Sequence, residues 1–358
     1  MRSMNLSAVQ PVVQPPSVLH DFYRWHWRDY SVLVLKRGLW GAVGLWCCLL
    51  LLTGLSLSSG SQSLSPAQAL LAAVGVGESM NVFLVQELRL HRLVCGLLTG
   101  FAFGVSGCLL QTLAHNRLAT PGIIGIDDGA TAFAVASIVA VPTSLAPPAL
   151  ALSGAAMAAA LSFGLSGGSG ARGYRFIVVG VGVGALFGAL TNLMLARTDI
   201  DSANAAYPWT VGSLNARADG PVWALALGIL VCLPFMGYLA RRLNTLRFSE
   251  AVACGLGVNL KRSRMLTLIA AVLLTALAVA VVGPVGLIAL VAPELARYLN
   301  GYKSVPLINA GLAGAVTMVA TDLIGRTALS PIEIPVGVIT AVVGGPYLLW
   351  ILLRPDCR

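Results

Sequence analysis

Apolar residues run along this chain in long blocks that short polar segments separate. About ten blocks approach the roughly 20 residues that a helix needs to cross a bilayer. Because a chain in lipid must satisfy its backbone hydrogen bonds internally, the pattern predicts ten transmembrane helices and no separate soluble domain. Pro284 and Pro293 predict that the eighth block is bent or partly re-entrant. The predicted spans are 38–58, 92–113, 121–142, 148–167, 176–196, 222–240, 265–282, 285–300, 306–325 and 335–353.

Composition supports an all-α polytopic membrane protein. The 358 residues are 57% hydrophobic and only 10% charged, whereas a soluble domain carries roughly 25% charged residues. The seven cysteines show no CxxC spacing and lie mostly inside apolar blocks. They are therefore interpreted as small core residues, and no disulfide or zinc framework is predicted.

The distribution of cations predicts the orientation. With the N-terminus inside, all but five of the 23 Lys and Arg residues fall on the cytoplasmic side, which favours cytoplasmic N- and C-termini. The expected division is an N-terminal extension at 1–37 and a transmembrane permease domain at 38–358. Trp25, Trp27 and Tyr30 favour an extension that lies along the membrane surface. The five outer cations are Arg89, Arg92, Arg197, Arg217 and Arg326.

The longest polar interruption in the second half is 241–264, a basic loop that the orientation places in the cytoplasm. Its centre predicts a short helix: Ser249 is a suitable cap, Glu250 suits the first turn, and Gly255 can end it. Such a helix is a feature that a soluble partner can bind. The alternative is a solvated connector.

No enzyme motif is present. The sequence lacks GxxxxGK[ST], HExxH and any clustered His/Cys ligand set, so we predict no catalytic residue, metal site or bound cofactor. Any ATP would be hydrolysed, with Mg²⁺, on another chain. The acidic residues of the spans, Asp127, Asp128, Glu294 and Asp322, fall near span ends and not at the mid-depth that an ion-coupled carrier requires. A secondary transporter is therefore the weaker alternative, as is a purely structural membrane protein.

Several motifs together carry a family resemblance that extends over about 39–353. Through them the chain resembles the FecCD-type permease subunits of bacterial ABC importers for iron–siderophores, haem and vitamin B12. The matching segments are Arg89-Leu-His-Arg92, Ser106-Gly-Cys-Leu-Leu-Gln111, Asn116 to Gly125, Trp209 to Leu214, Leu246 to Gly257, Asp322 to Arg326 and Glu333 to Trp350.

The chain departs from the family pattern at four places. His91 and Arg117 each replace a Pro, Glu294 replaces a His, and Asp127–Asp128 stand where small polar residues are usual. These changes bear on the substrate and the gate, and less on the family itself.

The resemblance implies a type II ABC importer permease fold in the bacterial inner membrane. It implies a permease dimer, of identical or different subunits, with two ATPase subunits and a periplasmic substrate-binding protein, and no nucleic-acid partner. A ferric siderophore is the expected cargo, with haem and cobalamin as alternatives.

The resemblance also implies site residues. Outward-facing Arg89, Arg92 and Arg326 would pair with Glu side chains of the binding protein; the alternative is snorkelling, or local pairing with Glu87, Asp322 and Glu333. The ATPase coupling segment would comprise Leu246, Ser249, Glu250, Ala253, Gly255, Leu256 and Gly257. The cytoplasmic gate would comprise Asn116, Leu118, Arg172 and Gly173. The pathway or its helix packing would involve Gly337, Thr340, Gly344 and Pro346.

Overall fold

Each of the ten predicted spans coincides with a helix in the computed structural model, which describes residues 22–27, 30–60, 64–139, 146–166, 173–215, 217–248, 250–329 and 332–353. These helices are α1 (Lys36–Ser58), α4 (His91–Leu113), α5 (Ile126–Val139), α6 (Pro147–Leu165), α7 (Gly173–Ala196), α9 (Asp219–Leu246), α11 (Leu260–Val282), α12 (Ile288–Leu299), α13 (Leu307–Thr327) and α14 (Val336–Leu353).

Seven helical segments of the described residues are long and apolar enough to cross a membrane. The helices α5 and α12 are shorter, with 14 and 12 residues. The eighth predicted span thus holds a helix of only three turns, with Pro284 before it and Pro293 inside it.

Shorter elements lie between the spans. They are α2 (Pro66–Ala73), α3 (Ser79–Phe83), the π-helix η2 (Leu84–Leu90), the 3₁₀ helix η3 (Pro121–Ile124), α8 (Ile200–Val211) and α10 (Glu250–Gly255). The strands β1 (Phe22–Trp27) and β2 (Tyr30–Leu35) form an antiparallel hairpin directly before α1. This hairpin is the one departure from the all-α expectation within the described residues.

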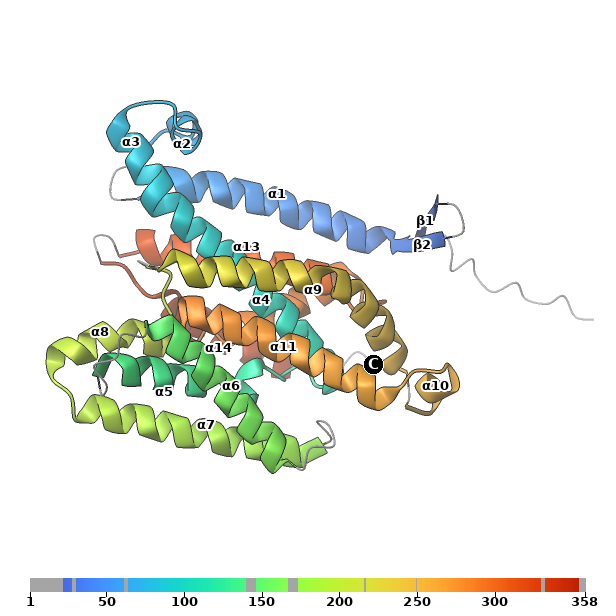
Figure 1. The fold of residues 1–358 in the computed structure, drawn as a ribbon. Coiled ribbons are helices and arrows are strands. Elements are labelled where there is room, and N and C mark those ends of the chain that lie inside the picture. The colour runs from blue at the N-terminus through green and yellow to red at the C-terminus, as the bar shows by residue number, and fades with distance from the viewer. Residues whose placement is uncertain are drawn as a thin grey trace, which may run out of the picture.

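The helix α4 lies at the centre of the bundle, where it packs against α11, α12 and α13. Its crossing with α13 depends on small residues: a Cβ at Gly104 would collide with the carbonyl oxygen of Ala310, and one at Gly100 with that of Gly314. The two backbones can approach this closely only because these positions are glycine. By contrast, α1 lies at the edge of the bundle (Figure 1) and is largely exposed.

The bundle has two distinct ends (Figure 1). The hairpin and α10 lie at one end, and α2, α3 and α8 lie at the other. We call them the α10 end and the α8 end. The predicted polar loop 241–264 is shorter than the sequence suggested, because α9 continues to Leu246 and α11 begins at Leu260. Buried Leu243 and Leu246 extend the packed face of α9 past its arginines.

Candidate functional site

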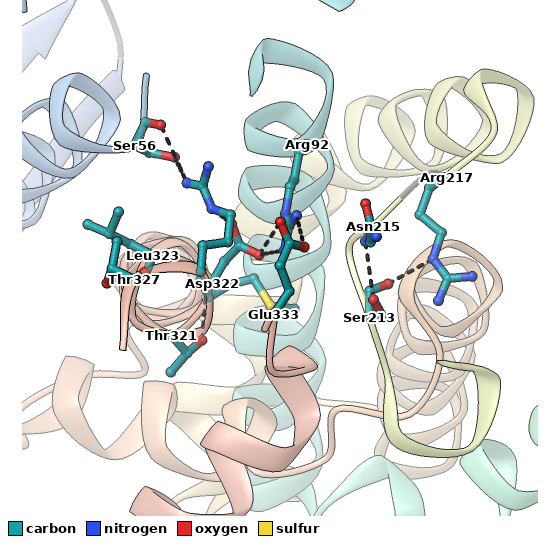
Figure 2. A network of polar contacts seen from close by, with 12 residues as sticks. Ser56, Arg92, Ser213, Asn215, Arg217, Thr321, Asp322, Leu323, Thr327 and Glu333 are labelled. Atoms are coloured by element: carbon teal, nitrogen blue, oxygen red, sulfur yellow. Dashed lines mark hydrogen bonds and ion pairs between the residues drawn. The ribbon is translucent and has the colours of Figure 1, made fainter. Parts of the chain in front are cut away.

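An ion network joins α4 to α13 at the α8 end. The Arg92 guanidinium lies 2.9 Å from the Asp322 carboxylate and 2.8 Å from Glu333 (Figure 2). Arg326, one turn after Asp322, approaches the second oxygen of that carboxylate at 3.1 Å. Asp322 is buried, whereas Glu333 is half exposed at the rim. A buried carboxylate between two guanidiniums is well compensated, which a charge at this depth requires.

Arg326 and a further arginine at this end, Arg89, also bind the last turn of α1. Arg89 Nη1 donates to the carbonyl oxygens of Leu57 (2.6 Å) and Ser58 (3.2 Å), and Arg326 Nη2 donates to Ser56 Oγ (2.7 Å). The carbonyls at a helix C-terminus lack intrahelical partners and carry partial negative charge, so cations stabilise that position.

The structure therefore brings the three predicted docking arginines together at one mouth, with their guanidiniums directed into the protein. For Arg92 and Arg326 it shows the alternative that the sequence left open, local pairing, with Asp322 and, for Arg92, also with Glu333. For Arg89 the recorded partners are the α1 carbonyls.

A second cluster at this end surrounds Arg217. Its guanidinium lies over the Trp209 ring, 4.4 Å from the centroid, and its Nε donates to the Ser213 carbonyl at 2.7 Å (Figure 2). Burial lowers the pKa of Arg217 to about 10, so the side chain remains charged at neutral pH. His91 contacts the same loop: Nε2 donates to the Arg217 carbonyl at 2.8 Å and Nδ1 lies 3.0 Å from Asp219. Thus His91 joins α4 to the start of α9.

The predicted pathway residues of α14 mostly make helix contacts. A Cβ at Gly337 would collide with the Val211 carbonyl, and Thr340 Oγ1 donates to the Gly337 carbonyl at 2.8 Å. Gly344 faces Leu287, whose Cδ2 atom would lie 2.7 Å from an added Cβ. Only Pro346 is exposed. For the first three positions, helix packing is the role that these contacts support.

The α10 end presents an apolar face. Phe248, Val252 and Leu256 are 74%, 48% and 67% exposed; Val252 lies in α10, Phe248 before it and Leu256 directly after it. Sequence reasoning missed Phe248 and Val252, although apolar residues four apart in a polar loop are a readable signal.

Some of the predicted coupling residues are buried against the bundle, and others are exposed. Leu246 and Ala253 are buried against the bundle, Leu256 is exposed, and Gly257 ends the segment with a φ of 77°. The predicted helix is present, and its last residue is Gly255. Ser249 lies outside the described residues, and for Glu250 only the helical backbone is described.

A cavity of about 230 Å³ lies between the α4–α5 loop, α7 and α11. Asn116 lines it together with Phe176 and Leu268, and Asn116 Oδ1 accepts a hydrogen bond from the Leu118 amide at 2.9 Å. The structure thus places the predicted gate loop beside the start of α7, whose first residue is Gly173. Arg172 lies outside the described residues.

Two of the acidic residues of the predicted spans lie in ion pairs. Asp322 pairs with Arg92 and Arg326, and Glu294 with Arg297 at 3.1 Å. Two of the four candidate acids are thereby occupied in ion pairs. The ion pairs disfavour an ion-coupling role for Asp322 and Glu294, because a coupling acid must take up and release its ion. Asp127 differs, because its Oδ1 atom is buried with no hydrogen-bond partner among the described residues.

Comparison with known proteins agrees with this geometry. Residues 48–354 match the model of the FecCD transport family. The ferric enterobactin transport system permease protein FepG of Escherichia coli (strain K12) is 35% identical over 299 residues, which cover 83% of this chain and 91% of FepG. The hemin transport system permease protein HmuU of Yersinia pestis is 34% identical over 278 residues, covering 75% and 82% of the two chains.

A solved structure shares the fold. It is described as an inward-facing conformation of a metal-chelate type ABC transporter, and it superposes with a TM-score of 0.76 at 28% sequence identity. The match covers 87% of this chain and 97% of the solved chain.

Proposed function

Because the chain belongs to the FecCD transport family, and is thus a multi-pass permease subunit of a bacterial ABC importer, we propose that its cargo is a ferric siderophore. The observation that carries this proposal is the 35% identity to FepG over most of both chains. The similarity to HmuU favours haem as the second candidate. The family is a transport family, so the chain is not an enzyme, and ATP is hydrolysed on a partner ATPase subunit.

Uptake by a strain that lacks this gene tests the cargo. Loss of ⁵⁵Fe uptake from at least one of ferric enterobactin, a ferric hydroxamate and ferric citrate, with restoration by the plasmid-borne gene, is the expected result. If haem uptake is lost and uptake of all three ferric chelates is normal, the siderophore assignment is wrong and the haem alternative holds.

We propose that α10 is the contact with the ATPase subunit. The support is the face of Phe248, Val252 and Leu256, an apolar surface at the tip of a polar segment, beside Glu250. Leu246 and Ala253 anchor the segment to the bundle, so that a push on α10 is passed to α9 and α11 as a rigid-body movement. Gly255 and Gly257 allow the tight turn that returns the chain to α11.

For the binding protein we propose docking at the α8 end around Arg89, Arg92 and Arg326. The support is that these three cations gather at one mouth, where Arg92 also reaches the half-exposed Glu333 at the rim. Cations gathered at one mouth attract an acidic partner even though each guanidinium has internal contacts.

We propose that the α10 end faces the cytoplasm, with both termini on that side and the 1–37 extension along the membrane surface. The support is the bias of Lys and Arg in the loops, together with the position of the hairpin at the same end of the bundle as α10 (Figure 1). A variant with Cys254, exposed on α10, as its single cysteine tests this. A membrane-impermeant maleimide is expected to label it only in inverted vesicles; labelling in right-side-out vesicles contradicts the orientation.

We propose that the gate lies at the cavity that Asn116 lines, and that Leu118, Arg172 and Gly173 belong to this gate. In α14, Gly337, Thr340 and Gly344 would hold the helix in position, and Pro346 would be nearest the pathway. A second permease subunit, identical or different, completes the transporter in this proposal. Purification from the native host in mild detergent identifies it.

A further inference from the structure

Two departures of this chain from the family pattern contact each other in space. Arg117 stands in the α4–α5 loop where the motif has Pro, and Glu294 stands in α12 where it has His. The Arg117 Nη1 atom lies 3.5 Å from Glu294 Oε1, although 177 residues separate them in the sequence. A cation of the α4–α5 loop and an anion of α12 thus form one pair.

Glu294 is the centre of a wider network at the α10 end. Its carboxylate is buried and also accepts hydrogen bonds from Arg297 Nε at 3.1 Å and from the Tyr302 hydroxyl at 2.8 Å. The Arg117 guanidinium lies over the Tyr302 ring, 5.2 Å from the centroid. Burial and the bond to Glu294 raise the pKa of Tyr302, so the hydroxyl stays protonated as a donor. Tyr302 therefore contacts both members of the charged pair.

The turn after α12, which contains Tyr302, is hydrogen-bonded to the end of α9, where the coupling segment begins. Arg247, directly after α9, donates through Nη2 to the Tyr302 carbonyl at 2.7 Å, and the Val305 amide donates to Asn244 Oδ1 at 2.8 Å. Tyr302 has a φ of 58°, a left-handed conformation that is costly for an aromatic residue and that these contacts maintain. The backbone of Tyr302 thus contacts α9, and its side chain contacts α12 and the gate loop.

We infer that Tyr302 is a positioning residue that transmits movement of the ATPase-docking segment to the α4–α5 gate loop, through its hydrogen bond to Glu294 and its contact with Arg117. This inference rests on the proposed function of α10 and of the gate. When α10 moves, Arg247 displaces the turn that contains Tyr302. Tyr302 in turn displaces the Arg117–Glu294 pair. A buried carboxylate keeps its donors because their loss leaves a charge uncompensated, so the linked groups move together.

The competing explanation is that Tyr302 is a brace that only stabilises the structure. The number of chelates transported per ATP hydrolysed distinguishes this explanation from the proposed relay. The importer, with its ATPase subunits, is reconstituted in proteoliposomes with the binding protein and its ferric chelate. Transport rate and ATP hydrolysis are then measured in the same vesicles. A brace contributes to stability and leaves the number of chelates moved per ATP unchanged, whereas a relay sets that number.

The variants are Tyr302→Phe, which keeps the ring and loses the hydroxyl, and Arg117→Gln, which removes an exposed charge. We expect chelates moved per ATP to fall about fivefold in each, the factor typical of one lost hydrogen bond. The double variant should be no worse than the more affected single variant, because both residues act on one path. The matched controls, Tyr298→Phe on the exposed side of α12 and Arg262→Gln in α11, should leave the ratio unchanged.

An unchanged ratio in both single variants, with normal assembly, overturns the relay. If Tyr302→Phe does not assemble, Arg117→Gln decides alone. A wild-type importer that hydrolyses ATP without moving a ferric chelate contradicts the proposed function itself. A coupled wild type with unaffected variants contradicts only the relay.

Discussion

Arg92 on α4 and Asp322 on α13 form a buried ion pair, 2.9 Å apart, at the α8 end of the bundle. The two residues are 230 positions apart in sequence, and Arg326 completes the pair from the opposite side. Because α4 is the central helix and α13 packs along it, this pair fixes the relative position of two helices at the centre of the bundle's packing. It is a structural contact at a mouth where the sequence left both recognition and local pairing open.

Replacement of Asp322 by Asn should destabilise the protein strongly. It leaves Arg92 and Arg326 buried with too little negative charge, a loss of about 3–5 kcal/mol for a broken buried pair. The measurement is the thermal midpoint of the purified permease in detergent. Glu333→Gln is the control, because Glu333 is half exposed and a surface pair contributes only about 0–1 kcal/mol. Equal midpoints for the two variants would show that the buried ion pair contributes no more to stability than the exposed one.

The Glu333→Gln variant also tests docking. Loss of one rim carboxylate increases the positive charge of the mouth, so an acidic binding protein should associate severalfold faster at low salt, with the difference reduced as salt is added. Stopped-flow or surface-binding kinetics would measure this, with Glu333→Asp as the control of unchanged charge. Identical association rates for Gln and Asp would argue against electrostatic docking at this mouth.

The apolar face of α10 should determine assembly with the ATPase subunit. Phe248→Asp is expected to abolish co-purification of the ATPase while the permease remains in the membrane, because a charge cannot be buried in an apolar contact without a partner. Leu70→Asp on α2, an exposed leucine at the opposite end of the bundle, is the matched control. Normal recovery of the ATPase with the Phe248 variant would place the docking contact elsewhere.

Glycine at the α4–α13 crossing should be required for folding. Gly104→Ala places a methyl group against the Ala310 carbonyl and should cost at least about 1–3 kcal/mol, as overpacking does. Gly182→Ala in α7 is the control, because no atom lies within 4 Å of the added Cβ. The readout is the fraction of monodisperse protein after detergent extraction. A Gly104 variant that behaves like the Gly182 variant would mean that the two helices can separate without penalty.

The sequence located the spans well. Every predicted span contains a helix of the structure, because the length of an apolar block is a local property that a bilayer crossing requires. The prediction of a short helix ending at Gly255 was confirmed for the same local reason. The end of α9 was misplaced by six residues, since two arginines at 241 and 242 resemble a loop, and only the burial of Leu243 and Leu246 reveals the continuing helix.

By itself, the sequence determined the class of the protein, the place of its long apolar helices and, through its motifs, its family. Only the tertiary structure decided what the charges do. For Arg92 the sequence left docking and local pairing open, and the structure shows pairing with Asp322. The sequence treated Arg117 and Glu294 as separate departures, and the structure shows that they contact each other. The physical reason is that hydrophobic length is encoded within one segment. The partner of a charge depends on which distant helices pack together, and no local pattern records that.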